Sequence, residues 1–225
     1  MALEATEQEH TMEQISPDLW VTATENPFPG LTTRAYLWIR SGGNVLFYNT
    51  TLATELDRMA ELGGVAHQYL SHQDEITATL ATVKQRFGSK LHIHASEAPL
   101  VETTTVDAPF TDRHTALGEL EVIPVPGHTP GSTVYLATID GRRHLFTGDT
   151  IVRGENGWWA GYIEGHSDRD ALLATLDVLA KLTPEVIVSS AFMGASGVTE
   201  LNGESWPDAV DEARRGLLSG QQIAP

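Results

Sequence analysis

An Asp-Gly pair lies between two runs of apolar, strand-forming residues. Asp140-Gly141 separates residues 134–139 from residues 144–146, and this dipeptide is typical of the two-residue turn of a β-hairpin. A hairpin requires antiparallel pairing, whereas a doubly wound nucleotide-binding fold is built on a parallel sheet. No glycine-rich phosphate-binding loop follows the first predicted strand. The sequence therefore favours mixed sheets over one all-parallel sheet.

Strand and helix patterns alternate through the rest of the chain. Leu52, Leu56 and Met59 recur at helical spacing before Gly63-Gly64, and Ser167-Asp168-Arg169-Asp170 reads as a capping box. This order predicts two mixed β-sheets with helices outside, in one domain over residues 15–225 after a flexible tail of residues 1–14. The pattern predicts strands over residues 37–40, 44–48, 67–70, 91–94, 120–125, 134–139, 144–146 and 186–188, and further helices over residues 76–87 and 208–218.

The charge balance and the missing cysteines limit the partners and ligands. The chain has 30 acidic and 14 basic residues, a net charge of −16, which argues against nucleic-acid binding. Without cysteine, any metal must be held by His, Asp and Glu. No apolar run approaches the roughly 20 residues of a membrane-spanning helix. The polar, acidic start is not a secretory signal, so we expect a cytoplasmic protein.

Three short segments place a His or a carboxylate where a strand gives way to a loop. They are Leu70–Glu75 with His72, Pro126–Ser132 with His128, and Leu145–Thr150 with Asp149. Strand ends over a rigid sheet are suitable places for a site. Imidazole and carboxylate together suit Zn, Fe or Mn, although each residue alone is more often structural.

Together the three segments resemble the metallo-β-lactamase superfamily. Pro-Gly-His-Thr-Pro-Gly-Ser and Thr-Gly-Asp-Thr, with Leu-Ser-His upstream, are similar to its metal-binding motifs over roughly residues 19–194. The resemblance implies a four-layer αββα sandwich. The family's main motif, His-x-His-x-Asp-His, is degenerate here: Asp74 replaces the second His, and Ile76 and Thr77 replace the last pair. The family's final His is also missing, because Ser189-Ser190 stands there.

The losses fall on one metal position. The resemblance implies that the first metal keeps His72 and His128, with Asp74 at the third position and the bridging Asp149 retained. The second metal loses its other ligands. We therefore expect one divalent ion, Zn or Fe or else Mn, held by His72, His128 and Asp149 with Asp74 as a fourth ligand. The alternative is a metal-free polar cluster.

Other residues are weaker candidates for the site. Trp158, Trp159 and Tyr162 either pack against a helix or form an aromatic wall over a substrate. His166 and His94 are further candidates for binding substrate, and His92 and His94 are predicted to point to one side of a strand. Glu75 is expected in the first turn of a helix rather than as a ligand.

The resemblance implies a hydrolase that acts on a small-molecule ester, thioester or lactone. His72, Asp74 and Asp149 would be its catalytic residues, with Asp74 or Asp149 orienting water or accepting its proton. Two alternatives use the same residues. One is an Fe(II)-dependent oxygenase, and the other is a metal-free protein that binds a ligand or carries out acid–base chemistry. The sequence does not predict the oligomeric state.

Overall fold

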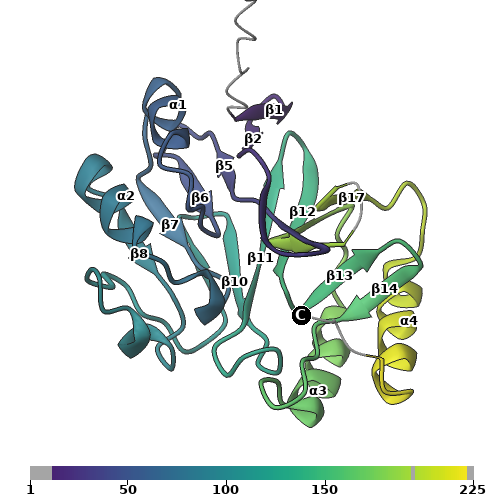
Figure 1. The fold of residues 1–225 in the computed structure, drawn as a ribbon. Coiled ribbons are helices and arrows are strands. Elements are labelled where there is room, and N and C mark those ends of the chain that lie inside the picture. The colour runs from purple at the N-terminus through teal and green to yellow at the C-terminus, as the bar shows by residue number, and fades with distance from the viewer. Residues whose placement is uncertain (1–11, 194–195, 222–225) are drawn as a thin grey trace, which may run out of the picture.

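Two six-stranded sheets form the centre of the molecule (Figure 1). The computed structural model describes residues 12–193 and 196–221. The first sheet has the order β1 (Glu13–Ser16), β2 (Leu19–Val21), β5 (Tyr36–Trp38), β6 (Val45–Phe47), β7 (His67–Tyr69) and β8 (Lys90–His92). The second has the order β17 (Val198–Glu200), β15 (Val186–Ser189), β12 (Arg142–Gly148), β11 (Thr133–Ile139), β10 (Leu120–Pro124) and β9 (His114–Ala116).

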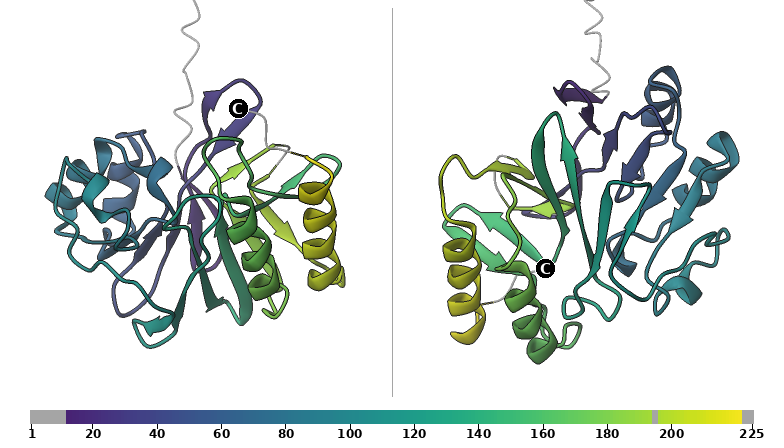
Figure 2. Two further views of the ribbon diagram at one scale, coloured as in Figure 1. Left: turned by 90° about the horizontal axis from the view of Figure 1, so that it is seen from below. Right: turned by 180° about the vertical axis from the view of Figure 1, so that it is seen from behind.

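Helices cover the outer face of each sheet. Helices α1 (Glu55–Glu61) and α2 (Thr79–Phe87) lie on the first sheet, and α3 (Arg169–Leu179) and α4 (Trp206–Leu218) lie on the second (Figure 2). Both sheets are mixed, because β6, β7 and β8 pair in parallel, as do β12 and β15. The predicted αββα sandwich is confirmed.

The two sheets pack through large apolar side chains. Phe47 of β6 and Phe146 of β12 stack with their ring centroids 3.8 Å apart, and both are fully buried. A second buried cluster joins the second sheet to α3 and α4 through Leu172, Leu176 and Val210. Burial of apolar surface on both faces of the second sheet holds the strand ends in place.

The Asp-Gly turn forms as predicted. Ile139 of β11 pairs with Arg142 of β12, so the turn has two residues. Asp140 and Gly141 have φ values of 51° and 77°, the left-handed conformation that this tight turn requires. Helix α3 starts one residue later than a capping box at Ser167 would place it. Asp168 is the N-cap, and its carboxylate accepts from the backbone N–H of Ala171.

The first strand begins nearer the N-terminus than expected. The predicted tail of residues 1–14 includes Glu13 and Gln14, which pair with β2 as part of β1. The side chain of Met12 is buried, and its backbone N–H donates to the Glu55 carboxylate at 2.8 Å. Pairing and burial tie this segment down, so the prediction is wrong for residues 12–14. Residues 1–11 lie outside the described residues.

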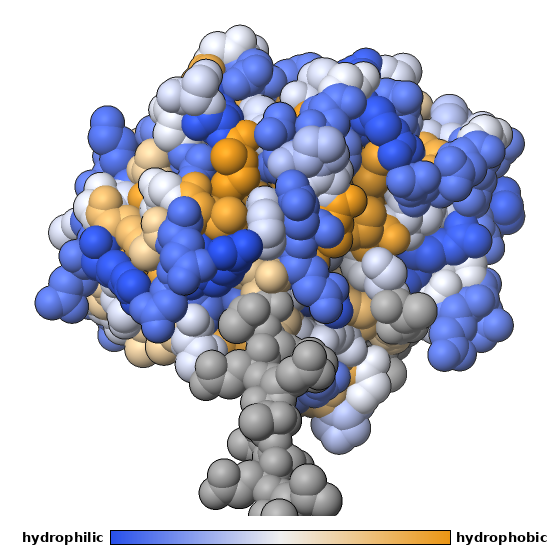
Figure 3. All heavy atoms as spheres, turned by 90° about the horizontal axis from the view of Figure 1, so that it is seen from above, coloured by the Kyte–Doolittle hydropathy of each residue, from blue (hydrophilic) through white to orange (hydrophobic). Residues whose placement is uncertain are grey.

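Two smaller sheets extend from the sandwich. Strands β13 (Ile151–Gly154) and β14 (Gly157–Ala160) form a hairpin, and β16 (Ala191–Phe192) pairs with the hairpin of β3 (Glu25–Phe28) and β4 (Leu31–Thr33). Short 3₁₀ turns cover Gln73–Glu75 and Ala98–Leu100. The face seen in Figure 3 is mostly hydrophilic, with apolar side chains in separate groups. Within the described residues, no helix is both long and apolar enough to span a membrane.

Candidate metal centre

The candidate site lies where strands of both sheets end. His72 follows β7, His128 follows β10, and Asp149 follows β12. Strands β10 and β12 both run antiparallel to β11, so their carboxyl ends lie at the same edge of the second sheet. All three residues line a cleft of about 940 Å³. The topology therefore brings together residues that are 77 positions apart in the sequence, from His72 to Asp149.

The His72 ring is oriented by residues next to it in the sequence. Its Nδ1 lies 2.8 Å from the Ser71 hydroxyl and 3.4 Å from the Glu75 carboxylate. The Ser71 hydroxyl and backbone N–H both donate to Glu75, at 2.5 and 2.8 Å. These contacts occupy one ring nitrogen, so the other, Nε2, faces the cleft.

The His128 ring is oriented by a backbone carbonyl. Its Nδ1 lies 2.7 Å from the carbonyl oxygen of Gly161 and donates to it. A carbonyl oxygen only accepts, so Nδ1 carries a proton and Nε2 is the nitrogen that faces the cleft. This is the arrangement in which a metal-ligating histidine is usually held, with its second nitrogen bonded to an oxygen acceptor.

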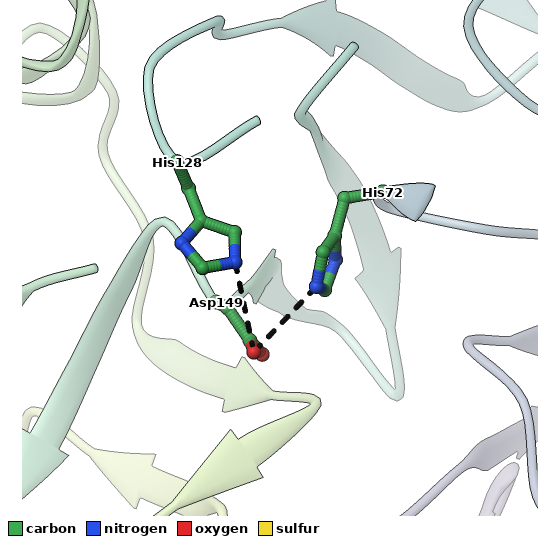
Figure 4. A group of neighbouring side chains, drawn as sticks. All are labelled: His72, His128 and Asp149. Atoms are coloured by element: carbon green, nitrogen blue, oxygen red, sulfur yellow. Dashed lines mark ion pairs between the residues drawn. The ribbon is translucent and has the colours of Figure 1, made fainter. Parts of the chain in front are cut away.

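Both Nε2 atoms approach the Asp149 carboxylate (Figure 4). The distance to Asp149 Oδ2 is 3.5 Å from His72 and 3.9 Å from His128. The two rings come from different segments and lie 4.8 Å apart between centroids. The other carboxylate oxygen of Asp149 accepts a hydrogen bond from the Ser190 hydroxyl.

These distances test whether the residues fit a metal ion. Both Nε2 atoms are buried and have no hydrogen-bond partner among the described residues, which is costly unless something occupies the space between them. Separations of 3.5–3.9 Å are long for hydrogen bonds. Ligand bonds of about 2.1 Å in a tetrahedron put donor atoms about 3.4 Å apart. The donor set therefore fits a small divalent ion.

Asp74 approaches the same two imidazole rings as Asp149 does. Its Oδ2 is 3.6 Å from His72 Nε2 and 3.5 Å from His128 Nε2. The same oxygen is 3.2 Å from His166 Nε2, so His166 reaches the site through Asp74. Asp74 remains 42% exposed in its side chain, which leaves it accessible to a bound substrate. The structure thus brings the four predicted ligands into one cleft, and His166 contacts them from outside its lining through Asp74.

The charges of the site shift its protonation equilibria in opposite directions. Burial alone lowers the pKa of His72, but Asp149 and Glu75 outweigh it and hold that pKa well above 6.5. Burial alone raises the pKa of Asp149, yet the two imidazoles and Ser190 bring it well below its usual value. Burial raises the pKa of Asp74 less than His128, His72 and His166 lower it. Both aspartates are therefore carboxylates at neutral pH.

Glu75 supports the site from behind. Its carboxyl group contacts Ser71 and His72, and burial raises its pKa more than those contacts lower it. It lies at the His72 Nδ1 nitrogen, on the far side of the ring from Asp149. Glu75 was expected as a first-turn helix residue. It lies in a 3₁₀ turn before α2, where its carboxyl group contacts His72 Nδ1.

The aromatic residues predicted for substrate binding lie elsewhere. Trp158 is 1% exposed, packs against Trp206 of α4, and donates its indole N–H to Glu204. Trp159 and Tyr162 are partly buried and are not among the residues that line the cleft, and Tyr162 packs against the helix side of the second sheet. Of the two alternatives, helix packing holds for Trp158 at α4 and for Tyr162 at Arg169 of α3, and none of the three rings forms a wall of this cleft.

His92 and His94 separate. His92 is buried and stacks on Tyr69, with ring centroids 4.0 Å apart. Strand β8 ends at His92, and the partly buried His94 instead contacts the Ser96 hydroxyl. The expectation that they share one side of a strand is wrong, because the strand does not extend that far. His94 does not line the cleft.

Several site residues carried no clear signal in the sequence. Tyr48 accepts from the backbone N–H of Gly148 and donates to the Val188 carbonyl, which fixes the end of β12. Gly161 accepts from His128 through its backbone carbonyl. Because every residue type has this group, the sequence gives no sign of the contact. Ser190 was detectable in principle, because it stands where the resemblance places the missing final His.

Comparisons with known proteins agree with the fold and identify the family. A family model described as the metallo-beta-lactamase superfamily matches residues 53–191. The solved structure of DIM-1 metallo-beta-lactamase exposed to ceftazidime is similar with a TM-score of 0.73 at 12% identity, over 93% of this chain and 96% of that one. No curated protein matches the sequence.

Two further solved structures are similar over nearly their whole length. A HARLDQ-motif mutant of a metallo-beta-lactamase from Cronobacter sakazakii has a TM-score of 0.69 at 17% identity, over 96% of this chain and 99% of that one. BJP-1, a subclass B3 metallo-beta-lactamase of Bradyrhizobium japonicum, has a TM-score of 0.64 at 18% identity, over 93% and 94%. At such identities the likeness shows the fold, and activity does not follow from it.

Proposed function

The chain belongs to the metallo-β-lactamase superfamily, and from this premise we propose that it is a hydrolase with at most one metal ion per chain. The observation that carries the proposal is the pair of buried, unpartnered Nε2 atoms of His72 and His128. Both face the Asp149 carboxylate at separations that suit tetrahedral ligation.

The proposed ligands are His72, His128 and Asp149, with Asp74 in reach as a fourth. A bound zinc, iron or manganese ion supplies Lewis-acid polarisation of a carbonyl group and lowers the pKa of coordinated water toward about 7. Glu75 and the Gly161 carbonyl hold the two rings with Nε2 toward the cleft. This orientation is provided by the chain before any ligand binds.

Asp74 is the proposed proton acceptor. It is ionised at neutral pH, partly exposed, and faces the same space as the two ring nitrogens. A hydrogen bond between its carboxylate and His166 keeps it aimed into the cleft. A carboxylate in this position can orient a water molecule and accept its proton during attack on a carbonyl carbon. His166 is thus assigned to positioning Asp74.

The proposed limit of one metal ion per chain comes from His128, which belongs to both possible sets of ligands. Two sets of residues bring donor atoms within 4.8 Å of one another: His72, His128 and Asp149, and Asp74, His128 and His166. Both sets need a free nitrogen of His128, and its Nδ1 is already bonded to Gly161. One nitrogen lone pair serves one ion, so the sets are alternatives.

The substrate we propose is a small-molecule ester, thioester or lactone. The cleft has the size of a small-molecule site and carries apolar walls beside the polar cluster. In the reaction, water adds to the carbonyl carbon and the alcohol or thiol departs with a proton. We expect the protein to act in the cytoplasm and without nucleic-acid partners, given its acidic charge.

Metal content and hydrolysis test this proposal together. Protein produced with Zn, Fe and Mn supplied, then dialysed, should retain one equivalent of metal per chain and hydrolyse p-nitrophenyl esters. His128→Ala should lose both properties, whereas His94→Ala, which removes a histidine outside the cleft, should keep both. Zero equivalents, or two tightly bound equivalents, would contradict the proposal. Bound iron with oxygen consumption and no ester hydrolysis would indicate an oxygenase instead.

A further inference from the structure

Arg34 lies on the cleft wall next to the candidate metal centre. It is in the connection between β4 and β5, and it lines the same cleft as His72 and Asp149. Its backbone N–H donates to the Ser190 carbonyl at 3.0 Å. The Ser190 hydroxyl in turn donates to the Asp149 carboxylate. Arg34 is therefore separated from the centre by a single residue.

The Arg34 guanidinium has no charged partner among the described residues. Its Nε is buried without a hydrogen-bond partner, and one terminal nitrogen makes a long 3.4 Å contact with the Thr24 hydroxyl. Within residues 12–193 and 196–221, no carboxylate oxygen lies within 4.0 Å of it. In a chain with 30 acidic and 14 basic residues, an unpaired arginine in a cleft is a costly arrangement unless it binds an anion.

The Glu25 carboxylate also lines the cleft, but it already has hydrogen-bond partners. Its two oxygens accept from the Thr50 hydroxyl at 2.5 Å, from the Thr51 backbone N–H at 2.9 and 3.1 Å, and from the Thr51 hydroxyl. Three donor groups, making four contacts, hold Glu25 against the segment that follows β6. It therefore does not turn to neutralise Arg34.

The wall around Arg34 is otherwise largely apolar. Phe28 and Leu31 of the β3–β4 hairpin and Phe192 of β16 line the same cleft. Such a wall suits the hydrocarbon part of a ligand, and a guanidinium gives two parallel donors that match a carboxylate. The cleft thus offers three adjoining features: an ion-binding polar cluster, an apolar wall and an unpaired cation.

We propose that Arg34 binds a carboxylate of the substrate, which makes the preferred substrate a half-ester or half-thioester of an organic diacid. This inference rests on the proposed hydrolase function for the reacting end of the molecule. The scissile carbonyl lies at His72, His128 and Asp149, the hydrocarbon chain crosses the apolar wall, and the free carboxylate pairs with the guanidinium. Recognition at Arg34 does not itself require hydrolysis, so the two proposals are separately testable.

Binding of a matched pair of probes tests the anion site without activity. Calorimetry should show that the holoprotein binds monomethyl glutarate at least about tenfold more tightly than dimethyl glutarate, because a charged hydrogen-bonded pair is formed. Arg34→Met should remove this difference, and Arg34→Lys should restore part of it. Arg153→Met removes the same charge from an exposed arginine paired with Glu204, and it should behave like the unmodified protein.

Each outcome decides the assignment. Equal affinities of the unmodified protein for the two probes, or the same preference in Arg34→Met, would overturn it. Binding of methyl phosphate but not of monomethyl glutarate would overturn the carboxylate in favour of a phosphate ligand. Thermal unfolding of Arg34→Met shows that the variant is folded. Should it unfold, Arg34→Lys carries the test, with a preference reduced by about threefold or more expected and an unchanged preference contradicting the assignment.

Kinetics then separate this inference from the proposed function. Mono-p-nitrophenyl glutarate should be hydrolysed with a lower KM than p-nitrophenyl valerate, and Arg34→Met should raise only the first KM. Loss of all hydrolysis with Arg34-dependent binding intact would reject the hydrolase and keep the anion site. Hydrolysis of both esters with one KM would reject the anion site and keep the hydrolase.

Discussion

The two sides of the cleft floor satisfy their polar atoms in different ways. On the ligand side (His72, His128 and Asp149), two buried ring nitrogens have no partner among the described residues. On the closed side (Asn49, Thr77 and Thr79), the Asn49 amide donates to the Thr77 hydroxyl at 2.8 Å and to the Glu75 carbonyl at 2.9 Å. The Thr77 and Thr79 hydroxyls lie 2.7 Å apart, and Thr79 donates to the Thr50 carbonyl at 2.6 Å.

This contrast bears on the proposed limit of one metal ion per chain. The resemblance places two lost ligands at Ile76 and Thr77. Ile76 packs into an apolar cluster with Leu80 and Leu91, and Thr77 belongs to the hydrogen-bonded network. The closed side is therefore a complete structure that needs no ion, whereas the ligand side is complete only with something bound.

The largest expected effect separates the two sides directly. His128→Ala removes a ligand nitrogen and should weaken metal binding by about a thousandfold or more, because a nitrogen–metal bond is lost while the ion's dehydration cost remains. Thr77→Val should change metal affinity by less than about threefold. Competition with a chromogenic chelator measures both. A large loss of affinity in Thr77→Val would show that the closed side also takes part in binding.

A pH dependence should be confined to the ligand side. Metal must displace a proton from His72, whose pKa is held well above 6.5 by Asp149 and Glu75 against the effect of burial. Below that raised pKa the proton competes, so affinity should fall by up to about tenfold for each unit that the pH is lowered. Calorimetry in two buffers of different ionisation enthalpy would show the proton release. Affinity that does not change with pH would contradict this account.

Glu75 should have an intermediate effect on metal affinity. Glu75→Ala removes the carboxylate that orients His72, and such changes cost about 10- to 100-fold in metal affinity. Glu75→Gln keeps an oxygen that can accept from Ser71 and should cost about tenfold at most. The same chelator competition applies. If both variants bind metal as the unmodified protein does, Glu75 serves the fold alone.

The smallest expected effect comes from His92, a buried imidazole outside the cleft. Its pKa is lowered, whereas the pKa of His72 is raised. Burial, then the neighbouring His67, lowers the pKa of His92 to about 3. The unfolded chain binds a proton near pH 6.5 and the folded chain does not, so stability is present above pH 6.5 and is lost as pH falls toward 3. Between pH 7 and pH 5 the loss should be at most about 2 kcal/mol.

Urea unfolding of the metal-free protein at the two pH values measures this loss. His92→Phe should reduce the difference between the two pH values, because the titrating group is removed while an aromatic ring remains to stack on Tyr69. His94→Phe, at a partly buried position two residues after His92, is the matched control and should leave the difference unchanged. An unaltered pH dependence in His92→Phe would assign the acid sensitivity to other groups.

The parts of the fold that were predictable depend on local patterns. The Asp140-Gly141 turn, the helix ending at Gly88 and the strands that lead to His72 and His128 follow from residue type and spacing over a few positions. The four polar residues could be gathered into one site because each follows a recognisable strand. Their roles as ligands remain predictions.

The missed features depend on contacts between distant segments. Trp158 faces α4 because Glu204, 46 residues later, accepts its N–H, and no local pattern contains that pairing. Arg34 reads as an ordinary charged residue until the β4–β5 connection places it beside Ser190. The 3₁₀ turn at Gln73–Glu75, which delays the start of α2, likewise depends on Glu75 bonding back to Ser71. Contacts that local sequence patterns do not encode therefore determine the positions of these residues.

The Tyr48 hydroxyl has a consequence for the mobility of one proposed ligand. Tyr48 directly follows β6 of the first sheet, and its hydroxyl bonds to Gly148 and Val188 of the second. Asp149 follows Gly148 directly, so this bridge between the layers restrains the backbone that carries the Asp149 carboxylate. A residue whose backbone is already fixed loses little conformational entropy when an ion binds, so most of that cost falls on folding instead.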